Sequence, residues 1–321
     1  MAIYKKILLA IDGSQASSQA MAKIASFATP GAAVRIVHVL EDPLTIYPMI
    51  NEDFTYIELL REVNMAEGKK LLAQAEAALR AQGYAVQTSL PDLRELGGDI
   101  PAALKAEGEA WDADLAVLGS HGRRGVRRML LGSVAEHFVR ISERPVLLVH
   151  PIEQAAGRLG HEPPAAPEQT GMLKRILVAV DGSELAQSAL RQASALAKEH
   201  GCEIRALYVN VDPFLAFPLL GVVYFQREPM LQAAAEQAAN IRKAALDVFD
   251  TFGIRGDVQI LDLETRDKRV ADLIREVGKR WNASAVVMGS HGLQGMQRLM
   301  LGSVAEHYLC IADRPVLIVK S

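Results

Sequence analysis

The sequence contains few cysteines, little net charge and no hydrophobic run long enough to cross a lipid bilayer. Its two cysteines, Cys202 and Cys310, match neither the spacing of a metal site nor a disulfide framework, so we expect two free thiols that are at least partly buried. The formal net charge of −3 offers no general attraction to nucleic acid or to an anionic membrane surface. The first residues lack the apolar core of a signal peptide, which predicts a cytoplasmic location.

Two common nucleotide-binding motifs are also absent. No G-x-x-x-x-G-K-[ST] pattern occurs, which argues against a P-loop ATPase, and no G-x-G occurs, which argues against a dinucleotide-binding fingerprint. Leu118 occupies the first glycine position of a G-x-S-x-G nucleophile elbow. No serine or cysteine nucleophile is placed to use Asp12 as a base, and no carboxylate cluster marks a metal site. We therefore predict no catalytic residue and no metal ligand.

Two parts of the sequence recur after about 170 residues. The segment Lys174–Ser183 repeats Lys5–Ser14, and Leu301–His307 repeats Leu131–His137 without a change. This spacing is far longer than the unit of a solenoid, so it indicates one duplicated domain and not an array of short repeats.

The stretch between the two copies has a different composition. It contains Pro163, Pro164 and Pro167 among alanine, glutamate and glutamine, which predicts an exposed linker. The predicted organisation is a first domain over residues 1–150, a proline-rich linker over residues 151–172, and a second domain over residues 173–321.

Each copy alternates unbroken apolar runs with amphipathic stretches, which predicts a parallel sheet with helices on both faces. In the first copy, the predicted strands are Lys6–Ile11, Val34–Val39, Tyr84–Leu90, Leu115–Leu118 and Val146–Val149. Its predicted helices are Ser14–Ala28 with Ser14 as the N-cap, Tyr56–Gln82, Ile100–Trp111 and Ser133–Ile141. The second copy offers strands at Ile204–Val209, Val258–Leu263 and Val316–Val319, and helices at Glu184–His200, Pro229–Phe252 and Lys268–Trp281.

A glycine-rich pattern follows the fourth strand of each copy. In the first copy, Gly119 and Gly122 are followed by nine residues and then by a Gly-Ser pair at positions 132 and 133, which opens a helix. Glycines at a strand end can adopt positive φ and let backbone N–H groups approach an anion. The amides at a helix N-terminus carry partial positive charge that favours phosphate. The pattern therefore predicts a phosphate-binding loop in each copy.

Other interpretations of these residues remain open. Ser133 and Glu136 have the S-x-x-E spacing of a capping box, as do Ser303 and Glu306, so each serine could cap its helix with no nucleotide present. For His121 we favour packing on the loop with a hydrogen bond to its backbone. For His137 and His307 we favour surface or interface positions. The first loop holds four arginines that suit phosphate oxygens but could equally form a solvated basic loop: Arg123, Arg124, Arg127 and Arg128.

The pattern Gly-x2-Gly-x9-Gly-Ser is the signature of the ATP-binding branch of the universal stress protein family (UspA superfamily), and both halves of the chain resemble it. The resemblance implies two Rossmann-like or flavodoxin-like domains of the adenine nucleotide alpha hydrolase type. Each would be a five-stranded parallel sheet of order 3-2-1-4-5. It also implies an intramolecular pseudo-dimer, in which the last strands of the two domains pair, and a homodimer of chains.

The resemblance further implies which residues bind ATP, commonly with Mg2+ or Mn2+. Ala10, Asp12, Ala179 and Asp181 would border adenine and ribose, and Val39 and Val209 would contact adenine through their main chain. Gly119, Gly122, Gly289 and Gly292 would line the ribose and phosphates. Gly132, Ser133, Gly302 and Ser303 would hold the phosphate tail, with Arg123, Val134 and Val304 beside them.

The predicted function is that of an ATP-binding, stress-response regulatory module whose loops and following helices are ordered by nucleotide. One alternative is an interaction scaffold without nucleotide, with partners docking on the proline-containing loops 42–48 and 212–218. The second alternative is a slow ATPase, although the sequence shows neither a dedicated base nor an arginine finger.

Overall fold

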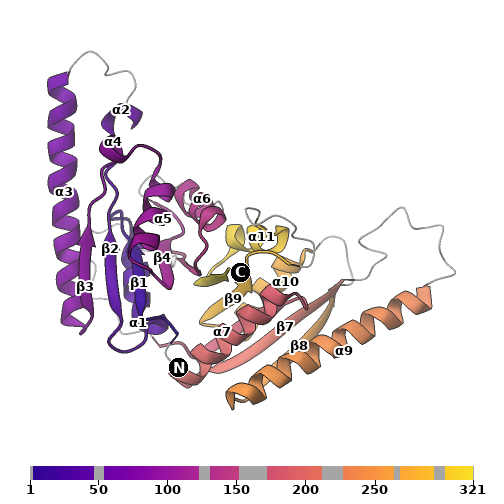
Figure 1. Ribbon diagram of the computed structural model, residues 1–321. Helices are drawn as coiled ribbons and strands as arrows, with labels where there is room; N and C mark the ends of the chain where they lie inside the picture. Colours follow the sequence, from indigo (N-terminus) through magenta and orange to yellow (C-terminus); the bar gives the residue numbers. More distant parts are fainter. Residues whose placement is uncertain are drawn as a thin grey trace, which may run out of the picture. The chain divides into compact units, whose positions relative to one another are not determined.

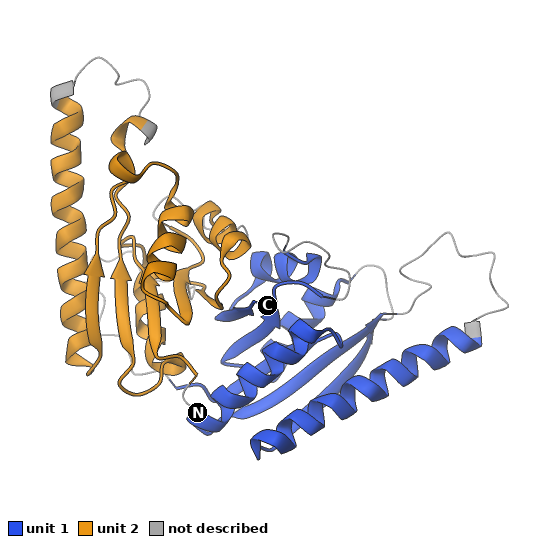
Figure 2. Cartoon of the chain, viewed as in Figure 1, with its two compact units in different colours: residues 1, 172–321 blue, residues 2–171 orange. Residues whose placement is uncertain are grey.

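A computed structural model describes residues 3–46, 54–122, 131–151, 172–211, 227–263, 268–292 and 301–320. The chain divides into two compact units (Figure 2). The N-terminal unit comprises residues 2–171, and the C-terminal unit comprises residues 172–321 together with residue 1.

The N-terminal unit contains a five-stranded parallel sheet of order β3-β2-β1-β4-β5, which confirms the predicted fold class and order (Figure 1). Its strands are β1 (Lys6–Ala10), β2 (Ala33–Val37), β3 (Ala85–Ser89), β4 (Leu115–Gly119) and β5 (Val146–Val149). Its helices are α1 (Gln15–Phe27), α2 (Pro43–Ile46), α3 (Phe54–Ala81), α4 (Leu93–Leu96), α5 (Ile100–Ala110) and α6 (Ser133–Ile141).

The C-terminal unit repeats this plan with the order β8-β7-β6-β9-β10. Its strands are β6 (Arg175–Val180), β7 (Glu203–Val211), β8 (Gly256–Leu263), β9 (Ala285–Gly289) and β10 (Val316–Val319). Its helices are α7 (Glu184–His200), α9 (Arg227–Phe252), α10 (Val270–Arg280) and α11 (Ser303–Ile311). Within each unit taken alone, the two sequence copies therefore adopt the same topology.

Unbroken apolar runs form the central strands because both faces of the sheet are covered. Ile7 of β1 lies in register with Val34 of β2 and Leu115 of β4, and all three side chains are fully buried. Parallel crossovers are right-handed, so the connections from β1 to β3 place α1 and α3 on one face. The connections from β3 to β5 run in the opposite direction and place α5 and α6, which pack on each other, on the other face.

Polar side chains start several of these helices. Ser14 caps α1 as predicted, with its Oγ accepting a hydrogen bond from the Ser17 amide at 3.2 Å. Asp99 caps α5, with Pro101 in the first turn, and thus marks a helix start that the sequence pattern left poorly defined. The short helices α2 and α4 fall in segments for which no helix was predicted, because four residues are too few to show a helical period.

Candidate functional site

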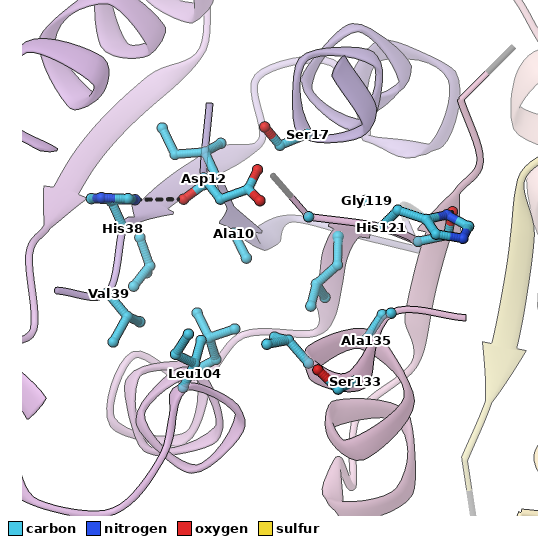
Figure 3. Close-up of a pocket in the computed structure, with 18 of the residues that line it drawn as sticks. Ala10, Asp12, Ser17, His38, Val39, Leu104, Gly119, His121, Ser133 and Ala135 are labelled. Carbon is cyan, nitrogen blue, oxygen red and sulfur yellow. Dashed lines mark hydrogen bonds between the residues drawn. The ribbon is translucent and has the colours of Figure 1, made fainter. Parts of the chain in front are cut away.

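A crevice of about 350 Å³ lies at the carboxyl ends of β1, β2 and β4 in the N-terminal unit (Figure 3). Strands β1 and β4 are neighbours in the sheet, and the chain continues from them to opposite sides. Such a switch point leaves space beyond the strand ends, where open α/β sheets bind ligands. The fold therefore places the crevice where its topology favours a site.

Eight of the predicted site residues of the first domain line this crevice. They are Ala10, Asp12, Val39, Gly119, Gly122, Gly132, Ser133 and Val134. Arg123 and the other three arginines of its loop lie outside the described residues. In Figure 3, His38, Val39 and Leu104 lie on one side of the crevice, and Gly119, Ser133 and Ala135 lie on the other.

The glycines of the motif are required by close packing and not, as predicted, by positive φ. A Cβ atom on Gly119 would lie 2.7 Å from the Cβ of Ala16, and one on Gly122 would lie 2.9 Å from Oδ2 of Asp12. Neither glycine is among those with positive φ in the described chain. Gly119 is thus needed because the backbone of α1 approaches it closely, whereas a side chain on Gly122 would have to displace the carboxylate of Asp12.

The N-terminus of α6 corrects the predicted capping box. The N-cap is Gly132, Ser133 is the first helical residue, and among the described residues no side chain caps the helix. The Gly132 amide donates to the carbonyl of Ser120 at 2.8 Å, and the Glu136 amide donates to the carbonyl of Gly132 at 2.8 Å. The intervening first turn lines the crevice, so its backbone amides present partial positive charge there.

Asp12 is held at the turn between β1 and α1. Its Oδ1 accepts a hydrogen bond from the Ser14 amide at 2.9 Å, and Gly13 between them has φ of +80°. A residue with a side chain would be strained at this φ. The tight turn leaves Oδ2 of Asp12 beside Gly122, so a carboxylate and the glycine loop face the same space.

His121 makes a different contact from the predicted one. Its Nδ1 lies 2.8 Å from Oγ of the preceding Ser120, a side-chain partner and not the loop backbone. His137 lies on the surface of α6 as expected, with Nδ1 3.2 Å from Oδ2 of Asp99. Of the two histidines, His121 lines the crevice and His137 does not.

Several lining residues were missed in the site prediction. Val37, His38 and Glu41 lie beside Val39 in the segment where the chain leaves the carboxyl end of β2. Their closeness to Val39 in the sequence was the signal that could have identified them. Ile100 and Leu104 of α5 also line the crevice, and no local pattern identifies them because a separate helix carries them there.

The C-terminal unit holds equivalent residues at the same strand ends. A Cβ atom on Gly289 would lie 2.9 Å from Cγ of Leu185, and one on Gly292 would collide with Asp181. Helix α11 has Gly302 as its N-cap and, within the described chain, no side-chain cap. Ala179 and Val209 lie in β6 and β7, and Ser303 and Val304 are the exposed first residues of α11. The capping-box interpretation is therefore also wrong for Ser303.

A separate groove of about 460 Å³ runs between α7 and α9 of the C-terminal unit. Of the predicted site residues it includes Asp181 alone.

In the described part of the chain, no group of three or more histidine, cysteine or acidic residues could hold a metal ion. No helix among the residues that the structure describes is long and apolar enough to cross a bilayer. Both cysteines are free and half-buried, as predicted.

Comparison with known proteins agrees with this architecture. The model of the universal stress protein family matches residues 3–150 and again residues 172–320. A universal stress protein of Mycobacterium tuberculosis (strain H37Rv) is 27% identical over 322 residues, covering 98% of this chain and 96% of that protein. The fold and the repeated crevice motif define a tandem α/β protein. The chain belongs to the universal stress protein family and carries two copies of its domain.

Solved structures show the same fold over the full length. A universal stress protein from Archaeoglobus fulgidus superposes with a TM-score of 0.63 at 20% identity, covering 99% of this chain and 98% of that one. Another structure of a universal stress protein from Archaeoglobus fulgidus contains dAMP; it is 22% identical, covers 46% of this chain and has a TM-score of 0.32.

Proposed function

We propose that the chain binds an adenine nucleotide, ATP, in the crevice of the N-terminal unit and acts as a regulatory module of the stress response. The observation that carries this proposal is the N-terminus of α6. Its first turn lines the crevice, and among the described residues no side chain caps it. Such amides favour a phosphate group as their partner.

The crevice suits the other parts of a nucleotide as well. Its volume of about 350 Å³ falls within the range of small-molecule sites. Val39 and Leu104 offer apolar contacts to a base on one side, and the opposite side carries the glycine loop and the amides of α6. Asp12 lies at the turn after β1, where its carboxylate can accept hydrogen bonds from ribose hydroxyls.

We propose an equivalent second site in the C-terminal unit because Asp181, Gly292 and Gly302 recur there in the same local arrangement. The domain limits 1–150 and 173–321, a companion Mg2+ or Mn2+, the cytoplasmic location and the pairing of the two domains remain predictions. The proposed mechanism is binding: a nucleotide that bridges α6 and the strand ends stabilises the folded unit by linkage.

The decisive experiment counts nucleotides released from the purified chain by denaturation, using mass spectrometry after incubation with ATP and Mg2+. We expect two ATP per chain, falling by one in Gly122→Val and by one in Gly292→Val, because each new side chain must displace the neighbouring aspartate. Ala102→Val adds comparable volume at an exposed position of α5 and should leave the count unchanged.

The other outcomes separate the alternatives. One ATP, lost with Gly122→Val alone, would confine binding to the N-terminal unit. No nucleotide in the wild type, with no rise in melting temperature on adding ATP, would contradict the proposal and favour an interaction scaffold. Steady release of ADP, abolished by Asp12→Ala or Asp181→Ala while binding persists, would favour a slow ATPase.

A further inference from the structure

His38 follows β2 and lines the crevice without appearing in the predicted site. Its side chain is buried, with 7% of the residue exposed. Its Nδ1 lies 2.8 Å from the carbonyl oxygen of Ile11, the contact drawn as a dashed line in Figure 3. A carbonyl oxygen can only accept a hydrogen bond, so Nδ1 carries the proton and donates it.

This hydrogen bond holds the peptide that leads into Asp12. The Ile11 amide donates to the carbonyl of Val37 at 2.9 Å, and His38 takes the carbonyl on the other side of the same residue. The Asp12 carboxylate follows directly, with Oδ1 bound to the Ser14 amide and Oδ2 beside Gly122. Rotation of the Ile11–Asp12 peptide would therefore move the carboxylate relative to the glycine loop.

Helix α3 packs closely against the imidazole ring of His38 at a glycine. Gly68 lies inside this 28-residue helix, where glycine is unfavourable. A Cβ atom on Gly68 would lie 2.9 Å from Cδ2 of His38 and 3.0 Å from Cδ1 of Leu90. The glycine lets α3 approach the ring closely enough to fix its orientation.

The C-terminal unit has different residues at the positions equivalent to His38 and Gly68. Tyr208 replaces His38 and is equally buried, with 8% exposed. A Cβ atom on Gly182 would lie 3.3 Å from Ile241 of α9, as one on Gly13 would lie 3.8 Å from Leu71 of α3. If Ile241 corresponds to Leu71, Ala238 takes the place of Gly68. The histidine and the glycine thus occur together in the N-terminal unit, and neither occurs at the equivalent position of the C-terminal unit.

We propose that His38 is a positioning residue of the N-terminal nucleotide site, which acts by fixing the Ile11–Asp12 peptide through its Nδ1 hydrogen bond. The inference rests on the proposed function of this crevice. It predicts that affinity for nucleotide depends on a donor at the Nδ1 position and on the close approach of Gly68, although Gly68 itself does not line the crevice.

The first test compares two amide substitutions in the full chain carrying Gly292→Val, so that the N-terminal site alone is titrated with ATP and Mg2+ by calorimetry. His38→Asn places its amide nitrogen near the position of Nδ1 and should keep the affinity within about threefold of the parent. His38→Gln places its amide near Nε2 and should weaken binding about tenfold, because the Ile11 carbonyl loses its donor.

The second test uses paired glycine substitutions in two helices. Gly68→Ala should weaken ATP binding about threefold or more, because the new methyl group displaces the His38 ring. Gly108→Ala in α5 is the matched control, since its Cβ would make an ordinary contact 3.5 Å from Leu8; it should leave affinity unchanged. Unfolding followed by Trp111 fluorescence in a Trp281→Phe background would check that each variant is folded.

The results of the two tests distinguish the positioning role of His38 from a loss of nucleotide binding altogether. Retained affinity in His38→Asn, with loss in His38→Gln and Gly68→Ala, would support the positioning role. Parent-like affinity in His38→Gln, or equal loss in His38→Asn and His38→Gln in folded protein, would overturn it while leaving nucleotide binding intact. Absence of ATP binding in the parent would overturn the proposed function and this inference with it.

Discussion

The Cβ atom of Ala16 lies 2.7 Å from the position that a Cβ atom would occupy on Gly119. The two residues are far apart in the sequence, yet α1 packs on the end of β4 so closely that its backbone, at Ala16 and Ser17, lies within 2.9 Å of the same position. Contacts with backbone cannot be relieved by a rotamer change. Gly119 is therefore a packing requirement of the crevice wall.

We expect Gly119→Ala to destabilise the N-terminal unit by about 1–3 kcal/mol, since overpacking must shift α1 or β4. Urea unfolding followed by Trp111 fluorescence in the Trp281→Phe background measures this free energy. Gly108→Ala, which adds the same methyl group at an uncrowded helical position, should be neutral or stabilising. Equal stability of Gly119→Ala and its parent would show that the crowding is relaxed at negligible cost.

Two serines at helix starts should respond differently to the same substitution. Ser14 caps α1 through its Oγ, so Ser14→Ala should cost about 1 kcal/mol of unfolding free energy. Ser133 stands one residue inside α6 and makes no capping bond, so Ser133→Ala should change stability by less than about 0.5 kcal/mol. Chemical denaturation of both variants checks the difference, and a clear loss in Ser133→Ala would restore the capping interpretation.

Asp114 should give the N-terminal unit a particular pH dependence. Burial raises the pKa of its carboxyl above the ordinary value of 3.8, although hydrogen bonds from the amides of Lys5 and Lys6 oppose this shift. The folded state then binds the Asp114 proton more tightly than the unfolded state. The stabilising contribution is full below pH 3.8 and is lost as pH rises through the higher folded pKa.

Asp114→Ser removes that titration and keeps an acceptor. At the equivalent position Ser284 accepts from the amides of Lys174 and Arg175 at 3.1 and 3.3 Å. Relative to wild type, the variant should therefore gain unfolding free energy as pH rises from 3.8 through the folded pKa of Asp114. Parallel stability curves for the two proteins across this range would contradict the assigned pKa shift.

Cys202 should be a poor nucleophile at neutral pH. Burial raises the pKa of its thiol to about 11, so the reactive thiolate is scarce near pH 7. In a Cys310→Ser variant, the rate of alkylation by iodoacetamide should still rise about tenfold per pH unit between pH 8 and pH 10. A plateau below pH 9 would contradict this burial effect.

Much of the fold could be predicted from local patterns. Unbroken apolar runs such as Leu115–Leu118 bounded by glycine indicate buried strands, and the alternation with helices indicates a parallel sheet. The duplication was visible because Leu131–His137 and Leu301–His307 are identical. These features depend on residues close together in the sequence, which a pattern can report.

For two features of the site, the helix cap of α6 and the glycines near the end of β4, local sequence patterns predicted the wrong physical cause. The S-x-x-E spacing at Ser133 resembles a capping box, but the loop enters α6 so that Gly132 takes the N-cap position. The glycines at the end of β4 and in the following loop suggested positive φ, whereas Gly119 is crowded by Ala16 of α1 and Gly122 by the side chain of Asp12. The Gly132 amide is held by the carbonyl of Ser120, and Gly119 is crowded by Ala16. Neither partner lies within the short pattern on which the prediction rested.

Local sequence patterns are sufficient to predict the two-domain α/β architecture, the strand patterns and the position of the glycine motif. Apolar periodicity and turn residues act over a few positions along the chain. The packing of separate elements brings His38 to the carbonyl of Ile11, sets Gly68 against its ring and places Leu104 in the lining of the crevice. These contacts depend on how separate strands and helices pack, and packing distances are set when the whole domain folds.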